Sequence, residues 1–351
     1  MKISIISFTA KGAALAQSIG GKLKSDMETA VYTKHRGLPD SLKAMYVEKN
    51  LTRWVEERFQ EHSALLFIGA CGIAVRAIAP SVKDKLEDSP VLVMDEAGRF
   101  VIPLLSGHFG GANELAETIA QLSGAVPVIT TATDVNDLFA VDVFARKNKL
   151  AVCNRGGIAT VSSSVLAGKT VTMAVAGPCT GNWPEELTPV PYPVDGKASV
   201  IVSPFTADAE KADLQLCPRA YVIGIGCKSG KAFSEIEEGA EKQLRKAGIR
   251  WEALAAVASV DRKKDEQGLL EFAEKHRLPF LTYSADRLSQ IDGDFSSSAF
   301  VEEQVGVDNV CERAAVAACG EDGKLIVRKY AENGITVAIA EKKWSVTFDE
   351  T

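Results

Sequence analysis

The alternation of apolar and polar segments along the chain predicts an α/β protein. Residues 2–8 are expected to form a buried strand, Ala13–Leu23 a helix, and Thr29–Thr33 a second strand. A further helix is expected to begin after Asn50, which has a side chain suited to capping it. Strands that alternate with helices in this way form mostly parallel sheets with helices on both faces.

Two glycine loops dominate the next part of the pattern. Strand 64–68 leads into the first loop and a short helix, which Pro80 ends, and strand 100–105 leads into the second loop and a helix over 112–122. A strand at 126–130 and, after a polar run, a helix from Leu138 to about Asn148 are expected to follow. A hairpin connection at 96–98 joins this second strand to the strand before it, at 91–95. Helices that begin at such loops aim unpaired N–H groups and partial positive charge forward. We therefore expect both loops at the carboxyl ends of strands, forming one anion-accepting crevice.

The second half of the chain predicts a weaker segment followed by another α/β unit. The weaker segment contains an expected helix at 158–166, a strand at 171–176 and an irregular proline-rich stretch at 184–193. The later unit is expected to contain strands 221–226, 255–260 and 280–283, helices ending near 246 and spanning 266–275 and 309–319, and a hairpin of 324–330 with 335–340. The prediction is two α/β domains with mostly parallel sheets, residues 1–150 and 218–351, joined by a smaller central α/β segment, 151–217.

Composition narrows the class of protein. The 351 residues carry a net charge of −6, which disfavours a non-specific nucleic-acid partner. No apolar run approaches the ~20 residues of a membrane helix, so no membrane partner is expected. The seven cysteines include no C-x-x-C pair, which favours a reducing, cytoplasmic location. The four histidines are scattered, so no protein-bound metal is expected.

Several motifs together resemble one family. They are the loop with Gly72, Arg76 and Pro80, the turn Asp95-Glu96-x-Gly98, the run Ser106-Gly107-His108-x-Gly110-Gly111-Ala112-Asn113, and Thr131-Ala132-Thr133-Asp134. With Gly224-x-Gly226-Cys227 they resemble CbiG, the cobalt-precorrin-5A hydrolase of anaerobic cobalamin biosynthesis. The resemblance covers nearly the whole chain, and its C-terminal part is also similar to CobE-type proteins. Lys228 stands where the family commonly has arginine, so the charge is kept without the bidentate fork.

The resemblance implies a cobalt-bound tetrapyrrole substrate whose δ-lactone is opened by water, with loss of the extruded carbon as acetaldehyde. The cobalt arrives with the substrate, so no cofactor is expected of the protein. The neighbouring methyltransferases of the pathway are expected as transient partners, and the sequence does not define the oligomeric state. The alternative is a non-catalytic protein that binds tetrapyrroles and hands them between enzymes. A nucleotide-binding protein is disfavoured, because neither glycine loop fits a nucleotide-binding motif.

The reaction needs a base, donors for an oxyanion, and cations for carboxylates. His108 is the expected general base, since an unperturbed pKa near ~6.5 suits proton transfer at neutral pH; the competing interpretation is a histidine that bonds a backbone carbonyl of its loop. Gly110, Gly111 and the N–H groups after them are expected to form the oxyanion site, with a plain tight turn before the helix as the alternative, and Gly107 is expected to contact the substrate. Ser106 is a weaker nucleophile candidate, for which a loop hydrogen bond is favoured. Asn113 would face the ligand or bond the loop.

The remaining candidates would hold the substrate's carboxylates. Gly72 and Arg76 are expected to do so in the N-terminal domain. In the C-terminal domain the candidates, against a solvated basic rim as the alternative, are Gly226, Lys228, Ser229, Gly230 and Arg262. Asp95 and Glu96 would orient His108 or form the turn, and the turn is favoured. For Asp134 we expect a cap on the next helix. All the loops are expected to border one cavity.

Overall fold

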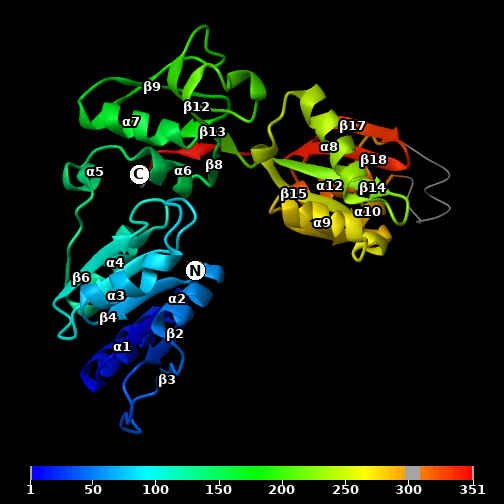
Figure 1. Ribbon diagram of the computed structural model, residues 1–351. Coiled ribbons are helices and arrows are strands. Elements are labelled where there is room, and N and C mark those ends of the chain that lie inside the picture. The colour runs from blue at the N-terminus through cyan, green and yellow to red at the C-terminus, as the bar shows by residue number, and fades with distance from the viewer. Residues whose placement is uncertain (1, 297–308, 350–351) are drawn as a thin grey trace. The chain divides into compact units, whose positions relative to one another are not determined.

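The computed structural model describes residues 2–296 and 309–349 of the chain (Figure 1). Its contacts divide the chain into two compact units, Met1–Val143 and Phe144–Thr351. Each unit is described by itself below. No helix in the described ranges is both long enough and apolar enough to cross a membrane.

The first unit alternates strands and helices in the predicted manner. In chain order its elements are β1 (Lys2–Ser7), α1 (Ala10–Leu23), β2 (Glu28–Thr33), β3 (Met45–Tyr46), α2 (Leu51–Gln60), β4 (Ala64–Ile68), α3 (Cys71–Ile78), the 3-10 turn η1 (Ala79–Ser81), β5 (Val91–Met94), β6 (Phe100–Leu105), α4 (Ala112–Ser123), β7 (Val126–Pro127), α5 (Ala132–Val135) and α6 (Val141–Lys147), whose last residues belong to the second unit.

The seven strands form one sheet in the order β3-β2-β1-β4-β5-β6-β7. All neighbours are parallel except β5 and β6, which are antiparallel, with Val91 opposite Leu105 and Met94 opposite Val101. The hairpin therefore turns β6 around, and the end of β6 lies beside the beginning of β5. The segment after β6 therefore leaves the sheet at the end where the strands β1, β4 and β5 begin.

Helices cover both faces of this sheet, as Figure 1 shows. Every residue of β4 is buried, the pattern of a central parallel strand. Side chains on one face, such as Leu66 and Ile68, pack with α1 and α4. Those on the other face, such as Phe67, pack with α2 and α3. The alternation of β-strand side chains thus divides the core of this unit into two layers.

The second unit contains two five-stranded sheets. In chain order its elements after α6 are β8 (Leu150–Val152), α7 (Gly156–Leu166), β9 (Val171–Val175), β10 (Cys179–Thr180), β11 (Leu187–Pro189), β12 (Ala198–Val202), η2 (Thr206–Asp208), β13 (Ala212–Pro218), β14 (Tyr221–Cys227), α8 (Phe233–Ala247), η3 (Trp251–Ala253), β15 (Leu254–Val260), η4 (Asp261–Lys263), α9 (Gln267–Lys275), β16 (Phe280–Tyr283), α10 (Ala285–Ser289), α12 (Cys311–Cys319), β17 (Lys324–Glu332), β18 (Ile335–Glu341) and β19 (Val346–Thr347).

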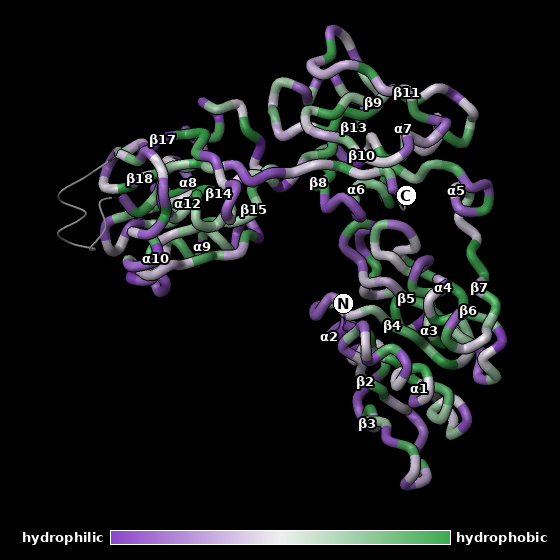
Figure 2. The backbone as a smooth tube through the Cα atoms, turned by 180° about the vertical axis from the view of Figure 1, so that it is seen from behind, coloured by the Kyte–Doolittle hydropathy of each residue, from purple (hydrophilic) through white to green (hydrophobic). Residues whose placement is uncertain are grey.

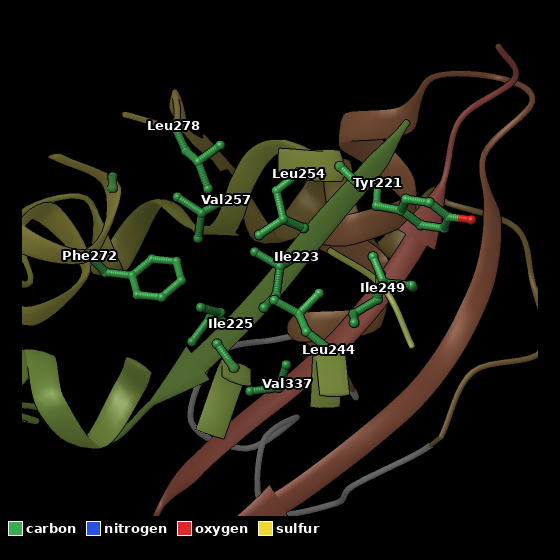
Figure 3. Close-up of a cluster of buried hydrophobic side chains, with 14 of the residues drawn as sticks. Tyr221, Ile223, Ile225, Leu244, Ile249, Leu254, Val257, Phe272, Leu278 and Val337 are labelled. Carbon is green, nitrogen blue, oxygen red and sulfur yellow. The ribbon is translucent and has the colours of Figure 1, made fainter. Parts of the chain in front are cut away.

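The central sheet has the order β11-β9-β12-β13-β8, and the later sheet β16-β15-β14-β18-β17. Strands β14, β15 and β16 are parallel, whereas β18 runs antiparallel to both β14 and β17, so the predicted hairpin is confirmed. Figure 3 shows the core of this sheet, in which Ile223 and Ile225 of β14 lie among Leu244 of α8, Phe272 of α9 and Val337 of β18.

Two elements differ from the sequence prediction in ways that affect the site. The strand expected at 126–130 ends at Pro127, and the polar run after it forms the short helix α5. The helix expected from Leu138 begins at Val141. The predicted cap at Asn50 is confirmed, because its side chain accepts a hydrogen bond from the amide of Thr52.

Candidate active site

The histidine loop between β6 and α4 folds back on itself. Ser106 has a positive φ of 57°, and Gly111, the residue before α4, has a φ of 82°. A Cβ on Gly110 would lie 2.4 Å from Cβ of Ser106, so only glycine fits there. The Ser106 hydroxyl donates to the carbonyl of Asp88 at 2.8 Å. The loop hydrogen bond favoured from the sequence is therefore what the structure shows for Ser106.

Three amides of the expected oxyanion site already donate hydrogen bonds inside the loop. The amide of Gly111 donates to the carbonyl of His108 at 2.9 Å, that of Ala112 to Ser106 at 3.1 Å, and that of Asn113 to Gly107 at 3.0 Å. An amide that already has a carbonyl partner at this distance cannot also be aimed at a substrate oxygen. These bonds disfavour Gly111 and the N–H groups after it as oxyanion donors, and the roles of Gly107 and Gly110 stay predictions.

His108 lies between two carboxylates. Its Nδ1 is 3.1 Å from Oδ1 of Asp142, and its Nε2 is 2.5 Å from Oδ2 of Asp134. The hydroxyl of Thr133 is also near Nε2, at 3.3 Å. Neither acid was among the predicted partners, and the alternative of a backbone carbonyl as partner of the ring does not describe this arrangement. Asp134, expected to cap a helix, instead directs its carboxylate at the imidazole.

This environment changes the charge of the imidazole. Burial by itself lowers the pKa of His108, but the hydrogen bonds and charges of Asp142 and Asp134 outweigh it and raise the pKa to about 9. Burial acts to raise the pKa of Asp142, yet the bond to His108 keeps it below its ordinary value. At neutral pH the ring is therefore an imidazolium. This environment favours a proton-donating His108 over the neutral general base that we expected from the sequence.

Asn113 and Asp134 complete the cluster. The Asn113 side-chain amide donates to Asp134 Oδ2 and to the Thr131 hydroxyl, both at 3.1 Å. Asn113 therefore helps to hold the Asp134 carboxylate in place. It is buried, as is Asp142, whereas one third of the Asp134 side chain, 33%, remains exposed. Asp134 is thus the most exposed member of the cluster, and the His108 ring beside it is partly exposed.

Gly72 and Arg76 lie at the opposite end of the strands, where β4 and β5 end. Gly69 donates to the carbonyl of Met94, the last residue of β5, which places the first glycine loop where β4 and β5 end. The histidine loop lies where β5 begins. The single crevice predicted for the two glycine loops is therefore wrong, because the β5–β6 hairpin separates them by the length of the strands. The exposed Arg76 reaches back to the carbonyl of Gly72 at 3.0 Å.

Asp95 and Glu96 also lie at that end of the strands. The Asp95 carboxylate accepts from the amides of Ala97, Arg99 and Phe100 within the turn. Glu96 accepts from the Thr9 hydroxyl at 2.8 Å. Both side chains serve the connections of the sheet, which confirms the favoured interpretation of the turn and leaves neither acid to orient His108.

The candidates in the second unit gather where β14 and β15 end. The amide of Gly230 donates to Oε1 of Glu266 at 2.6 Å, and the Ser229 hydroxyl and the Lys263 ammonium reach Oε2 at 3.4 and 2.8 Å. Glu266 was not among the residues predicted from the sequence. It connects the Ser229–Gly230 loop to Lys263, next to Arg262. Lys228 is exposed and its amide donates to Gly334 at 2.8 Å, while Gly226 lies against Thr336. A common cavity with the histidine loop stays a prediction.

Comparison with known proteins supports the sequence resemblance. Family models described as Cobalamin synthesis G N-terminal, Cobalamin biosynthesis central region and Cobalamin synthesis G C-terminus match residues 53–134, 139–218 and 221–340. A protein of Salmonella typhimurium named cobalt-precorrin-5A hydrolase is 33% identical over 96% of this chain and 97% of its own, and one of the same name from Priestia megaterium is 29% identical over 96% and 94%.

The C-terminal part has a second relative. Protein CobE of Sinorhizobium sp is 31% identical over 34% of this chain and 78% of its own. This agrees with the resemblance expected for the C-terminal α/β part alone. With all three family models in order and a relative that is 33% identical over nearly the full length, the chain belongs to the CbiG family of cobalamin biosynthesis proteins.

Proposed function

We propose that this protein is a cobalt-precorrin-5A hydrolase, which opens the δ-lactone of its substrate and releases the extruded carbon with its methyl group as acetaldehyde. The full-length relatives carry that name. The observation that supports a catalytic role is the largely enclosed imidazole held between Asp142 and Asp134, of which Asp134 is the more exposed carboxylate. Clusters in which charged groups shift each other's pKa are frequent at catalytic sites.

The geometry favours a division of roles in which His108 is the acid. Asp134 accepts a proton from the attacking water, and the hydroxide adds to the lactone carbonyl. As the acyl–oxygen bond breaks, Nε2 of His108 gives its proton to the departing alkoxide. Asp134 then returns its proton to Nε2, so the pair ends as it began. Asp142 holds the other ring nitrogen and acts as a positioning residue.

The lactone opening prepares the carbon–carbon cleavage. The freed hydroxyl group loses its proton, a carbonyl forms on that carbon, and its bond to the macrocycle breaks. The electron pair of that bond passes to the macrocycle, where a proton is taken up, and acetaldehyde leaves. The chain needs no cofactor of its own for these steps, and the cobalt belongs to the substrate. A cytoplasmic location and transient contact with the pathway's methyltransferases are part of the same proposal.

The decisive experiment is incubation of the purified protein with the cobalt-corrinoid lactone, followed by an acetaldehyde assay. An enzyme releases one acetaldehyde for each substrate consumed and does so catalytically. A protein that only binds and hands over tetrapyrroles would bind the lactone without acetaldehyde. That result would overturn the proposal in favour of the carrier.

A further inference from the structure

A basic pocket lies in the second unit, at the other end of β14 from the predicted Ser229 loop. It has a volume of about 310 Å³ and is situated where β14 and β15 begin, whereas the Ser229 loop follows the end of β14. A seven-residue strand separates the two places. The pocket is lined by Asn148, Lys149, Leu150, Pro218, Arg219, Ala255, Lys342, Lys343, Trp344 and Ser345.

The charge of this basic pocket is of one sign. Four of its ten lining residues are Lys or Arg, and none is Asp or Glu. Lys343 pairs with Asp322, outside the lining, at 2.8 Å. Within the described ranges, no carboxylate lies at ion-pair distance from Lys149, Arg219 or Lys342. Like charges gathered around one hollow repel each other until an anion enters it.

Two chain connections that pack together build the pocket. Arg219 lies between β13 and β14, and Lys342–Ser345 lie between β18 and β19; the amide of Lys342 donates to the carbonyl of Ala220 at 2.9 Å. In Figure 2 the tube near β8 and β14, the region of these connections, includes purple, hydrophilic stretches. The cations therefore come from distant parts of the sequence and meet only in the fold.

Contacts of β19 and of the residue after it hold the pocket's backbone in place. Strand β19 pairs with β10, and Asn148 exchanges two hydrogen bonds with the backbone of Thr347, at 2.9 and 2.7 Å. Phe348 stacks on Phe144 with their ring centroids 4.9 Å apart. The backbone that carries the cations is thus tied down before any ligand binds, which lowers the entropic cost of binding.

We infer that the basic pocket binds carboxylate groups at the periphery of the tetrapyrrole substrate. This inference rests on the proposed function. A pocket of 310 Å³ is too small for a macrocycle. At about 30 Å³ for each water-sized group, a propionate arm of five heavy atoms fills roughly half of it, which leaves room for a second arm. Ammonium and guanidinium groups are the partners that carboxylates prefer.

The alternative source of an anion is phosphate, which has the same donor requirement. The test therefore uses three probes: cobyrinic acid, whose acetate and propionate arms are free; its fully amidated counterpart; and inorganic phosphate. Binding is measured by calorimetry on the full chain. The test variant is R219Q/K342Q, and the matched control is K169Q/K197Q, which removes two exposed lysines elsewhere in the same unit. R219K is the conservative variant.

The expected result is at least a tenfold loss of affinity for cobyrinic acid in R219Q/K342Q, with less than a twofold change in the control and partial retention in R219K. The amidated corrinoid should bind wild type and R219Q/K342Q equally. Wild-type affinity of R219Q/K342Q for cobyrinic acid, or an equal loss in the control, would overturn the inference. Loss of phosphate binding alone would overturn the assignment to substrate arms.

The outcome is separable from that of the proposed function. If wild type binds cobyrinic acid through these cations but releases no acetaldehyde from the lactone, the basic pocket stands and the hydrolase proposal fails. If acetaldehyde is released at the wild-type rate and KM by R219Q/K342Q, the hydrolase proposal stands and the basic pocket fails.

Discussion

Replacing Asp142 by asparagine tests the charge of the His108 ring directly. The carboxylate of Asp142 lies 3.1 Å from Nδ1 and helps to raise the pKa of His108 from 6.5 to about 9. Asn keeps the shape and an oxygen acceptor but removes the charge. Since an opposite charge at this distance typically shifts a pKa by about 1 to 3 units, we expect the pKa of His108 in D142N to fall by that order.

The same change should lower stability in a pH-dependent way. The folded-state pKa of His108 lies above its unfolded value, so its contribution is fully present below pH 6.5 and is lost as the pH rises through about 9. The difference between the unfolded pKa of 6.5 and the folded pKa of about 9 corresponds to about 3 kcal/mol of unfolding free energy in the wild type. In D142N, His108 keeps only one of its two carboxylate partners, so the free energy of unfolding at pH 6 should fall by about 2 kcal/mol. The difference should shrink as the pH rises through about 9 and vanish well above it, where the ring is neutral in both proteins.

Three measurements check this reasoning. Histidine proton resonances report the pKa, and the four histidines are few enough to assign by substitution. Thermal unfolding at pH 6 and at a pH well above 9 reports the stability. The pH dependence of acetaldehyde release reports the role: with His108 as the acid, the rate falls as the pH rises through its pKa, and this fall moves to lower pH in D142N.

The matched control is D137N, since Asp137 is exposed, carries a φ of 51° that asparagine tolerates, and lies in the same segment. Three results would refute the reasoning: a wild-type His108 that titrates near 6.5, a rate that rises with pH through the pKa of His108, or a D142N protein whose His108 titrates like that of wild type.

Three further predictions follow from the site and the fold. H108A should lose roughly 100-fold or more in acetaldehyde release with an unchanged circular dichroism spectrum; near-wild-type turnover would exclude His108 from the chemistry. G110A should unfold at lower temperature, because its methyl group would lie 2.4 Å from Cβ of Ser106, whereas G21A, whose methyl group meets no neighbour at a backbone conformation open to alanine, should lose less; equal losses would contradict the packing argument. A chain ending at residue 217 lacks β19 and Phe348, so it should show little activity and an unfolding temperature several degrees below that of the full chain; full activity would defeat this.

The sequence by itself determined the elements and the family. The buried run 64–68, the helix after Asn50 and the 324–340 hairpin could be predicted because each depends on local pattern, capping or turn chemistry. Sequence reasoning also identified His108, Asn113 and the glycine loop, since motifs in the expected order mark the CbiG family. Glycine at 110 and 111 is likewise a local requirement of the backbone.

Tertiary structure alone decided what surrounds those residues. Asp134 and Asp142 lie 26 and 34 positions from His108 and approach it only because β7 runs beside β6 and delivers α5 and α6 to the same edge. The prediction of a single crevice was wrong because the hairpin reverses β6. Two loops that both follow strands therefore lie at opposite ends of the sheet's strands. The basic pocket likewise combines Lys149, Arg219 and Lys342, whose charges meet only through packing. A pKa depends on such distances in space, which no spacing along the chain specifies.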